Sequence, residues 1–454
     1  MLTKIAVCIA MGAKLLALSC SNPVTIAQYE HTKHADEKIH NFQLKVNEKG
    51  DLTSFWCTKE ALGSALQIAH KWKGEEWTSP AIITRAADFN WLTTHLSAQR
   101  EMYVAWRVGS NFGDIKSHPI CYARRTGEGH WYINSQVFNR SEGIYFQNMV
   151  MDKEGKLFLS GLTSNFVLDL IEAQPKHPQE DPLFQQFFKN EGYFAKVETA
   201  VGAKGTACAT WLTIEENPQT KIDHCFLECS LKRVDFPWSE PEKVYVAAFP
   251  LNDSYGKISS IKTVIDSQGN PTIIWTVRES ANLIKIQAIS RVDGSWVGPI
   301  DLCAPTEWIY SLEAAIDDQD NILAVWKEYH VQKGGKKSVI CGAYKPCQEN
   351  WTPPVIISDP KIDSCDPVLA HDHRGTFVVA WMSGFGRPGR VYGSSFSKKY
   401  SAWSMPALLT PEGSLGLSPV LAFSENGEGY MAWLDCSDQR KIQVAQLQIK
   451  NNGN

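Results

Sequence analysis

The sequence predicts an all-β fold that is built from eight copies of one repeat of about 50 residues. Three observations support this prediction. A tryptophan closes an apolar run in seven copies, a glycine precedes this position by six residues in six copies, and a second tryptophan, usually followed by proline, comes later in most copies. Each copy holds four short apolar runs, and repeated units of four antiparallel strands are typical of β-propeller blades. We therefore predict an eight-bladed β-propeller.

The first repeated position is the residue that ends the second run of each copy. These markers are Trp56, Trp106, Gly161, Trp211, Trp275, Trp326, Trp381 and Trp433. The residues six places earlier are Gly50, Arg100, Gly155, Gly205, Gly269, Asp320, Gly375 and Gly427. A glycine after Asp or Asn fits a tight hairpin turn with a positive φ. Each marker therefore ends the second strand of a hairpin.

The second repeated position lies near the end of each copy. It holds Trp77, Trp131, Trp238, Trp296, Trp351 and Trp403, and five of the six have proline three residues later. Proline cannot donate a hydrogen bond to a central ladder, so the fourth strand should lie at an edge of its sheet. Thirteen of the 16 tryptophans occupy these two positions, which indicates that they fill the core between blades.

The third copy is irregular, and it leaves seven blades as the alternative to eight. It lacks both tryptophans, and residues 171–193 form an irregular insertion with three prolines. The prolines exclude a long regular element at its start, whereas LFQQFF could form a turn or two of helix. A solenoid is the other alternative, but four short strands with a terminal edge strand suit radial packing better.

The N-terminal residues 1–20 have the features of a secretory signal peptide, with Lys4 before a short apolar run. Their end, LALSC, resembles a bacterial lipobox in which Cys20 would carry a lipid, although Ala17 departs from that pattern. Residues 21–454 then form one propeller domain. The last copy has three strands, and the segment from Asn22 to Ala27 resembles the missing fourth one. We predict that this N-terminal strand closes the ring, because closure removes open edges.

Composition narrows the class of partner. A net charge of -4 and a pI near 6.3 provide no broad positive field, which argues against nucleic acid as a partner. No later segment is long and apolar enough to span a membrane. Ten cysteines follow Cys20 and permit disulfides in an exported chain, but their connectivity cannot be read. We expect an extracytoplasmic monomer that is secreted, periplasmic or anchored by lipid to the outer membrane.

The hairpin motif resembles that of the wider β-propeller group, including the sialidase-like propellers with Asp-box turns and exported bacterial propellers. The resemblance covers nearly the whole chain after the signal peptide. The tryptophan here lies six residues after the glycine, farther than in the sialidase box, and no arginine triad is recognisable. The resemblance therefore implies an architecture and carries over no catalytic residue.

Ligands of propellers favour the face that carries the loops between blades. In this sequence those loops combine acidic and aromatic residues, which suits stacking on sugars or contact with a basic peptide. The candidate ligand-binding residues are Asp88, Trp91, Glu142, Tyr145, Asp253, Tyr255, Glu307, Trp308, Tyr310, Asp363 and Asp366. The simpler interpretation is that polar loops are ordinary and that the aromatic residues cover the blade ends.

Other motifs do not indicate chemistry. The pair His371 and His373 lies in a hairpin turn without further ligands nearby in the sequence, so we expect no metal site and no cofactor. We predict an exported cell-envelope module that binds a protein or a glycan through the loops between blades. The alternative is a glycan-active hydrolase or lyase that uses carboxylates at the rim, and a structural role of the third copy is a further possibility.

Overall fold

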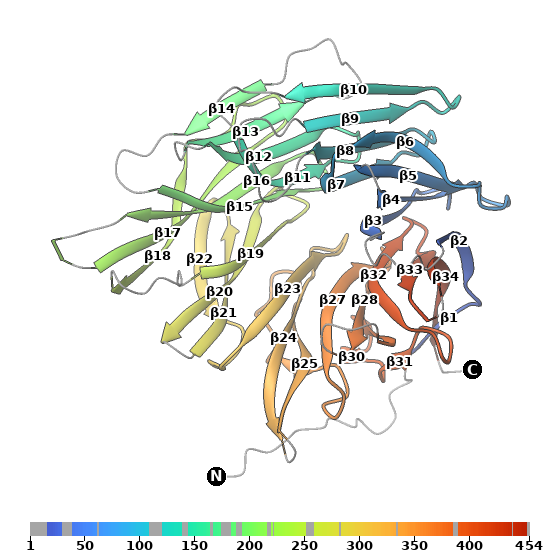
Figure 1. The fold of residues 1–454 in the computed structure, drawn as a ribbon. Helices are drawn as coiled ribbons and strands as arrows, with labels where there is room; N and C mark the ends of the chain where they lie inside the picture. The colour runs from blue at the N-terminus through green and yellow to red at the C-terminus, as the bar shows by residue number, and fades with distance from the viewer. Residues whose placement is uncertain are drawn as a thin grey trace.

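The computed structural model describes residues 16–29, 39–60, 63–108, 120–138, 144–163, 167–173, 183–187, 193–215, 219–220, 222–250, 258–280, 283–332, 335–384, 389–437 and 439–451. All regular elements among these residues are strands. The strands form eight antiparallel sheets arranged in a ring, which confirms the predicted eight-bladed β-propeller (Figure 1).

The first four blades follow one another along the chain. Blade 1 holds β3 (Ile39–Val46), β4 (Leu52–Glu60), β5 (Gly63–Lys71) and β6 (Ala81–Ala86). Blade 2 holds β7 (Phe89–Leu96), β8 (Met102–Val108), β9 (Ile120–Arg125) and β10 (Trp131–Phe138). Blade 3 holds β11 (Ile144–Met151), β12 (Leu157–Thr163), β13 (Leu168–Ala173) and β14 (Leu183–Phe187). Blade 4 holds β15 (Tyr193–Val201), β16 (Ala207–Glu215), β17 (Ile222–Lys232) and β18 (Glu242–Pro250).

The other four blades complete the ring. Blade 5 holds β19 (Ile258–Ile265), β20 (Pro271–Ser280), β21 (Leu283–Val292) and β22 (Ser295–Asp301). Blade 6 holds β23 (Ile309–Ile316), β24 (Ile322–Gln332), β25 (Gly335–Lys345) and β26 (Val355–Ile356). Blade 7 holds β27 (Ser364–His371), β28 (Thr376–Ser383), β29 (Val391–Ser397), β30 (Ala402–Trp403) and β31 (Ala407–Leu408). Blade 8 holds β32 (Gly416–Phe423), β33 (Gly429–Asp435) and β34 (Arg440–Asn451), with β1 (Leu16–Cys20) and β2 (Val24–Tyr29) beside β34.

The order of strands in each blade defines an axis and two faces. The first strands of neighbouring blades contact one another in a closed ring, so they surround the centre. The fourth strand lies at the outer edge of its sheet, as the prolines predict. Because neighbouring strands are antiparallel, the hairpin turns after the first strands lie on one face, called here the turn face. The connections between blades lie on the other, called here the loop face, together with the loops between second and third strands.

An N-terminal strand closes the ring, as predicted. Strand β2 pairs with the first part of β34, with Val24 opposite Val444. Strand β1 pairs with the second part, with Leu18 opposite Ile449, and Leu18 is buried beside Trp433 and Leu447. The expected signal peptide of residues 1–20 therefore ends in a strand of the eighth blade, while residues 1–15 lie outside the described part of the chain.

The hairpin turns after the first strands have the backbone that their sequence predicts. The eight residues six places before the markers all have a positive φ, between 61° and 90°. In the turn of blade 3, the carboxylate of Asp152 accepts hydrogen bonds from the backbone N–H groups of Glu154 and Lys156, at 2.9 and 2.8 Å. An acid at the start of the turn thus satisfies donors that the hairpin leaves free.

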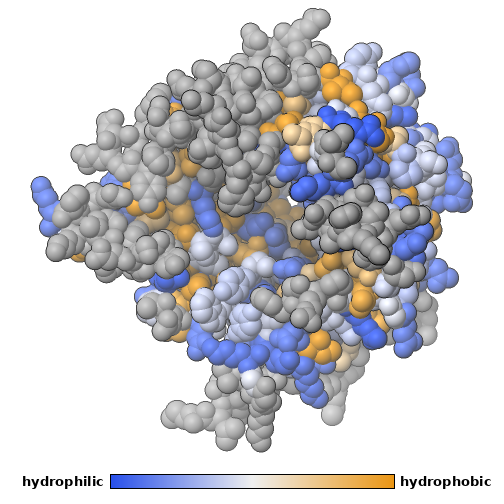
Figure 2. Space-filling model, viewed as in Figure 1, coloured by the Kyte–Doolittle hydropathy of each residue, from blue (hydrophilic) through white to orange (hydrophobic). Residues whose placement is uncertain are grey.

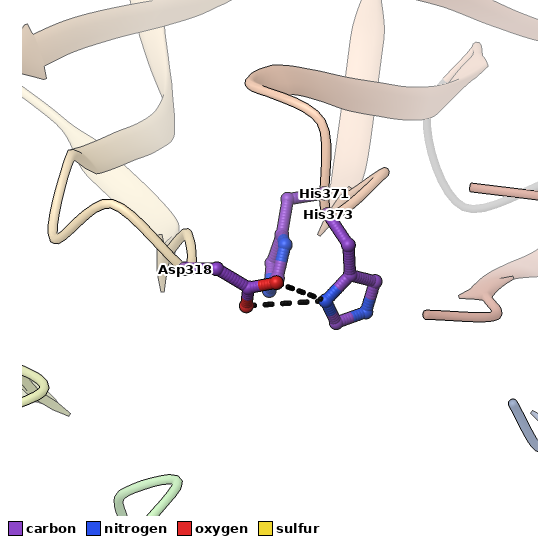
Figure 3. A group of neighbouring side chains, drawn as sticks. All are labelled: Asp318, His371 and His373. Carbon is purple, nitrogen blue, oxygen red and sulfur yellow. Dashed lines mark hydrogen bonds and ion pairs between the residues drawn. The ribbon is translucent and has the colours of Figure 1, made fainter. Parts of the chain in front are cut away.

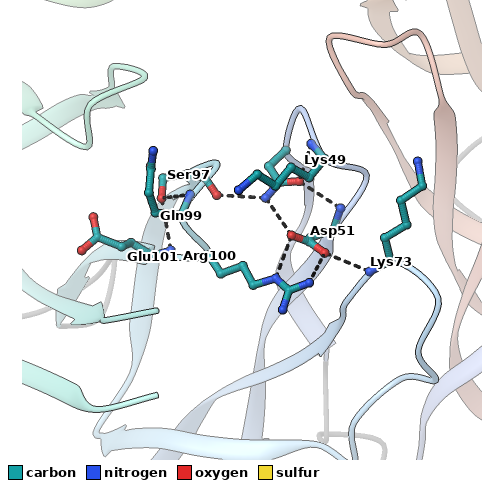
Figure 4. A network of polar contacts seen from close by, with 8 residues as sticks. Lys49, Asp51, Lys73, Ser97, Gln99, Arg100 and Glu101 are labelled. Carbon is teal, nitrogen blue, oxygen red and sulfur yellow. Dashed lines mark hydrogen bonds and ion pairs between the residues drawn. The ribbon is translucent and has the colours of Figure 1, made fainter. Parts of the chain in front are cut away.

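Polar contacts join the turns of neighbouring blades. Asp51 of blade 1 has a fully buried side chain and accepts two hydrogen bonds from Arg100 of blade 2, at 3.0 and 3.2 Å (Figure 4). Asp320 of blade 6 accepts hydrogen bonds from the backbone N–H and the hydroxyl of Ser267 in blade 5, both at 2.7 Å. Arg100 and Asp320 are the two positions where a larger residue replaces glycine, so these contacts compensate for a less favourable φ.

The markers form the core between blades. The side chains of Trp56, Trp211, Trp275, Trp326 and Trp433 are fully buried, and those of Trp106 and Trp381 are 2% exposed. Five tryptophans of the second set, Trp77, Trp131, Trp296, Trp351 and Trp403, are partly buried and pack against the same clusters. The sixth, Trp238, is buried within its cluster. Burial of large aromatic rings between sheets holds the blades together.

The third blade corrects the prediction of a helical turn. Leu183–Phe187 forms β14, which pairs with β13 as the fourth strand of this blade. Phe187 stacks on Trp211 of blade 4, with ring centroids 5.8 Å apart. The segment is a strand because its backbone completes the ladder of β13 and its apolar side chain fills the space between blades.

The cysteines give no covalent link in the part of the chain that the structure describes. Cys225 and Cys229, like the nine other described cysteines, are free thiols. Burial raises the pKa of Cys225 to about 12, which keeps its thiol protonated and unreactive at neutral pH. Within the described residues, no helix has the length and apolar character needed to cross a membrane.

Candidate functional site

An exposed aromatic cluster lies on the loop face of blade 6. Trp308 and Tyr310 are each 44% exposed, and their rings are stacked with centroids 6.1 Å apart and an angle of 5° between the planes. The ring of Tyr329 meets Tyr310 edge-on at 6.4 Å. The ammonium group of Lys327 lies 5.4 Å from the Tyr310 ring and 5.6 Å from the Tyr329 ring. We call these four residues the aromatic platform.

The strand pairing of blade 6 assembles this platform. Tyr310 in β23 lies directly opposite Lys327 in β24, and Tyr329 lies two residues after Lys327. Residues two apart on a strand share a face, so Lys327 and Tyr329 both reach Tyr310. The sequence predicted Trp308 and Tyr310. It did not reveal Lys327 and Tyr329, because their proximity depends on the register between two strands.

Two predicted carboxylates beside the platform are engaged in ion pairs. Glu307 pairs with Lys336, and Asp363 pairs with Lys337 at 2.7 Å. Asp363 also accepts a hydrogen bond from the backbone N–H of Ser338 at 3.0 Å. Burial alone would raise the pKa of Asp363, but the bonds from Lys337 and Ser338 outweigh it and lower the pKa. Asp363 is therefore ionised, and its contacts connect the loops of blades 6 and 7.

The other predicted residues are distributed around the ring. Asp366 is exposed and has a φ of 51°. Asp88 accepts a hydrogen bond from the backbone N–H of Phe89, whose ring is fully buried, so this acid and aromatic pair covers a blade end. Glu142, Asp253 and Tyr255 lie outside the described residues, as do the side chains of Trp91 and Tyr145.

Every first strand carries an irregularity that the sequence did not reveal. The pairing register of the first and second strands shifts in all eight blades, at equivalent places near the loop face. Non-glycine residues with a positive φ occur at several of these shifts, namely Asn41, Lys196, Ser311, Asp366 and Ser418. A β-bulge re-aims the side chains that follow it. The eight bulges therefore set which side chains point toward the axis.

A cluster of charged residues follows these bulges. Asn148, Glu198, Lys262 and Glu313 each lie opposite the residue before their blade's marker, so they occupy one level of the ring. Asn148 donates a hydrogen bond to Glu198 at 3.0 Å, and Lys262 forms an ion pair with Glu313 at 3.0 Å. We call these four residues the axial cluster. The space-filling view shows a hollow around the centre of the ring, with hydrophilic side chains beside it (Figure 2).

Burial and neighbouring charges shift the pKa values of two members of the axial cluster, Glu198 and Lys262. Burial raises the pKa of Glu198 to about 7, and the negative charge of Glu313 acts in the same direction. Burial would lower the pKa of Lys262, but Glu313 and Glu198 outweigh it and raise the pKa. Lys262 therefore stays protonated at neutral pH while Glu198 exchanges a proton. A carboxyl group with a pKa near 7 is suited to general acid or base chemistry.

A repeat alignment contains the signal for the axial cluster, although the sequence analysis did not use it. The side chains of a first strand otherwise alternate between core and solvent. One position departs from this alternation and holds a polar or charged residue. At the equivalent places, blades 7 and 8 have Val368 and Val420, opposite Ala380 and Ala432. Blades 1 and 2 have the uncharged Gln43 and Thr93 there. The charges therefore gather on the side of the axis formed by blades 4 to 6.

The turn face has a cavity of about 600 Å³ between blades 7 and 8. Arg374, Lys398 and Lys399 line it together with Tyr400 and Thr376. Lys398 donates to the side-chain oxygen of Gln319 at 2.9 Å, and Arg374 donates to the backbone oxygen of Asn426. Lys398 and Arg374 therefore also link neighbouring turns, and the charge of the three cations suits an anionic group.

Comparisons with known proteins identify the architecture. No family model and no curated protein matches the chain. Among solved structures, the polysaccharide lyase Uly1 matches with a TM-score of 0.51 and 9% identity, over 95% of this chain and 99% of that one. An ulvan lyase has a TM-score of 0.48 and 10% identity, over 79% and 93% of the two chains.

The NanB sialidase from Streptococcus pneumoniae has a TM-score of 0.38 and 8% identity, over 95% of this chain and 71% of that one. The likeness to Uly1 shows a shared fold and leaves the chemistry open. It agrees with the sequence motif and with the ring of eight blades. The chain is an eight-bladed β-propeller.

Proposed function

We propose that this chain is an exported cell-envelope module that binds a glycan through the aromatic platform. The observation that carries the proposal is the stacked and exposed pair of Trp308 and Tyr310. The faces of aromatic rings pack against the apolar faces of sugar rings, and exposed aromatic residues need such a partner more than buried ones do. Lys327 lies beside the rings of Tyr310 and Tyr329 and is itself only 5% exposed.

Two further features support a glycan rather than a protein ligand. The platform is flanked by the ion pair of Glu307 and Lys336, which offers hydrogen-bond partners to hydroxyl groups. The structural neighbour Uly1 is a polysaccharide lyase, so a propeller of this overall shape accommodates a polysaccharide. The signal-peptide features of residues 1–20 support a location outside the cytoplasm, where such polymers occur.

A glycan array, followed by titration of the best glycan, tests this function. The double variant Trp308→Ala and Tyr310→Ala should lose at least tenfold in affinity, because stacking on aromatic rings contributes about 1 to 3 kcal/mol. Tyr400→Ala is the matched control, because it removes an aromatic residue from the turn-face cavity. Equal binding by wild type and double variant would refute the platform as the site. Capture of a protein partner without any glycan signal would favour the protein-binding alternative.

A second function, glycan-active hydrolysis or elimination, is favoured by the axial cluster. The sequence analysis assigned this chemistry to carboxylates at the rim, but Glu307 and Asp363 are held in ion pairs. Glu198 is better suited, because its pKa of about 7 lets it take up or release a proton under physiological conditions. Lys262 could stabilise negative charge that develops on a uronate or on a leaving oxygen.

Product analysis of acidic polysaccharides incubated with the protein tests this second function. A lyase forms an unsaturated sugar that absorbs ultraviolet light, whereas a hydrolase releases only reducing ends. Glu198→Gln should reduce turnover by about 10²- to 10⁴-fold, the usual contribution of a general acid or base. If Glu198 acts as the base, the rate should rise with pH through about 7. Glu349→Gln, the control, alters an exposed carboxylate of the turn face and should retain turnover. An equally active Glu198→Gln would exclude this role.

A further inference from the structure

Three potential metal ligands converge on the turn face between blades 6 and 7. Asp318 comes from the turn between β23 and β24, His371 ends β27, and His373 lies in the turn between β27 and β28 (Figure 3). One ligand atom from each residue lies within 4.8 Å of the other two. The two imidazole rings are 4.4 Å apart between centroids. The sequence analysis found no further ligand near the two histidines, because Asp318 is 53 residues before His371.

A simple contact between turns accounts for only part of this cluster. Nδ1 of His373 lies 3.1 and 2.9 Å from the two carboxylate oxygens of Asp318, which resembles the polar contacts at other blade junctions. His371 has no part in that contact. Its Nδ1 is buried and has no hydrogen-bond partner. A buried nitrogen without a partner costs about 1 to 3 kcal/mol, so the contact between turns leaves the His371 side chain unexplained.

The side chains also have suitable chemistry and access. Burial lowers the pKa of His371, so its imidazole is neutral at neutral pH and has a lone pair for a metal. The side chains of Asp318 and His373 are 59% and 23% exposed, so an ion can reach them from solvent. Two imidazoles and one carboxylate favour transition metals such as Zn²⁺, whereas Ca²⁺ and Mg²⁺ prefer sites made of oxygen ligands.

We propose that Asp318, His371 and His373 bind one divalent transition-metal ion that bridges blades 6 and 7. The protein supplies three ligands, and solvent or a ligand group completes the coordination shell. Such an ion would fix the two turns relative to each other. It would also place a positive charge near the turn-face cavity, whose lining includes Asp372 and Gln319 from the same two turns.

Calorimetric titration of the full chain with ZnCl₂ tests this proposal, after chelator treatment and without a histidine tag. We expect one equivalent of Zn²⁺ to bind, and no saturable binding of Ca²⁺ or Mg²⁺. His371→Ala leaves the contact between Asp318 and His373 intact and should weaken Zn²⁺ binding at least tenfold, because even the loss of a group behind the ligands costs 10- to 100-fold. Co²⁺ should give the visible absorption spectrum of a site with nitrogen and oxygen ligands.

Two variants keep the test decisive. Asp318→Asn alters an exposed side chain, so the chain should stay folded while Zn²⁺ affinity falls by a similar factor. His130→Ala removes an exposed histidine from the turn between β9 and β10 of blade 2, and it should bind Zn²⁺ like the wild type. The proposal is overturned if the wild type shows no saturable binding, or if both cluster variants bind Zn²⁺ with unchanged affinity.

Discussion

At the scale of residues, the turns show how a repeat tolerates departures from its own pattern. Glycine is the residue that adopts a positive φ most easily, yet Arg100 and Asp320 adopt φ values of 62° and 61° at the same turn position. The side chain of each residue forms hydrogen bonds with a polar group of the neighbouring turn. The sequence predicts the turn from its glycines, but it cannot show the partner, because Arg100 and Asp51 meet only when two blades pack together.

Asp51 supplies the residue-scale prediction, because its buried carboxylate joins three segments. It accepts hydrogen bonds from Arg100, the backbone N–H of Lys73 and the side chain of Asn47 (Figure 4). Asp51→Ala should destabilise the protein by about 1 to 3 kcal/mol, measured by denaturant unfolding, because buried donors lose their acceptor. Glu307→Ala, which breaks an exposed ion pair, should cost under about 1 kcal/mol. Equal effects would show that the Asp51 network adds nothing to stability.

The contribution of the Asp51 carboxylate to the stability of the folded protein depends on pH. Burial alone would raise the pKa of Asp51, but hydrogen bonds from Arg100, Lys73 and Asn47 outweigh it and lower the pKa. The ionised form is thus favoured in the folded state. The contribution should be complete above the unfolded pKa of about 4 and should disappear as the pH falls through the lower folded value. The stability difference between wild type and Asp51→Ala should therefore shrink below about pH 4.

At the scale of elements, strands with a periodic signature were predictable and local irregularities were not. The markers and prolines identify the second and fourth strands, because core packing and edge position constrain those residue types. The bulges have no such signature, since Asn41, Lys196, Ser311, Asp366 and Ser418 are all polar but differ in size and charge. They result from how a first strand pairs with its neighbour close to the axis. The axial cluster depends on these bulges, and its signal, a polar residue at one position of the first strand, emerges only when the repeats are aligned with one another.

The candidate site also contains some residues that the sequence predicts and others that depend on strand pairing. Trp308 and Tyr310 were identified because they are aromatic residues in a connection between blades, and the repeat pattern does not account for aromatic residues there. Lys327 and Tyr329 lie in β24, where they read as ordinary strand residues. Strand β14 was not predicted, because its short sequence fits a helical turn. It is a strand because its backbone pairs with β13. Tertiary pairing overrides local propensity in β14.

At the scale of the whole molecule, ring closure links the two ends of the chain. Strands β1 and β2 share β34, so the eighth blade depends on residues from both ends. Cleavage before Cys20, as the lipobox resemblance implies, would remove β1 and leave β2. The ring would still be closed by β2, but Leu18 would leave the cluster that contains Trp433 and Leu447. Closure by β2 and burial of Leu18 are thus separable contributions to the stability of the eighth blade.

Chains of two lengths measure these contributions. A chain that starts at Ser21 should fold, because β2 still pairs with β34, but its unfolding midpoint should lie below that of a chain containing β1. In the longer chain, Leu18→Ala should lower the free energy of unfolding by about 2 to 5 kcal/mol, the usual cost of truncating a buried leucine. Leu18 is 3% exposed, whereas Ser19 is only partly buried, so Ser19→Ala is the matched control and should have little effect. An unchanged midpoint in Leu18→Ala would show that β1 contributes nothing to the folded protein and would favour a mature chain that begins after it.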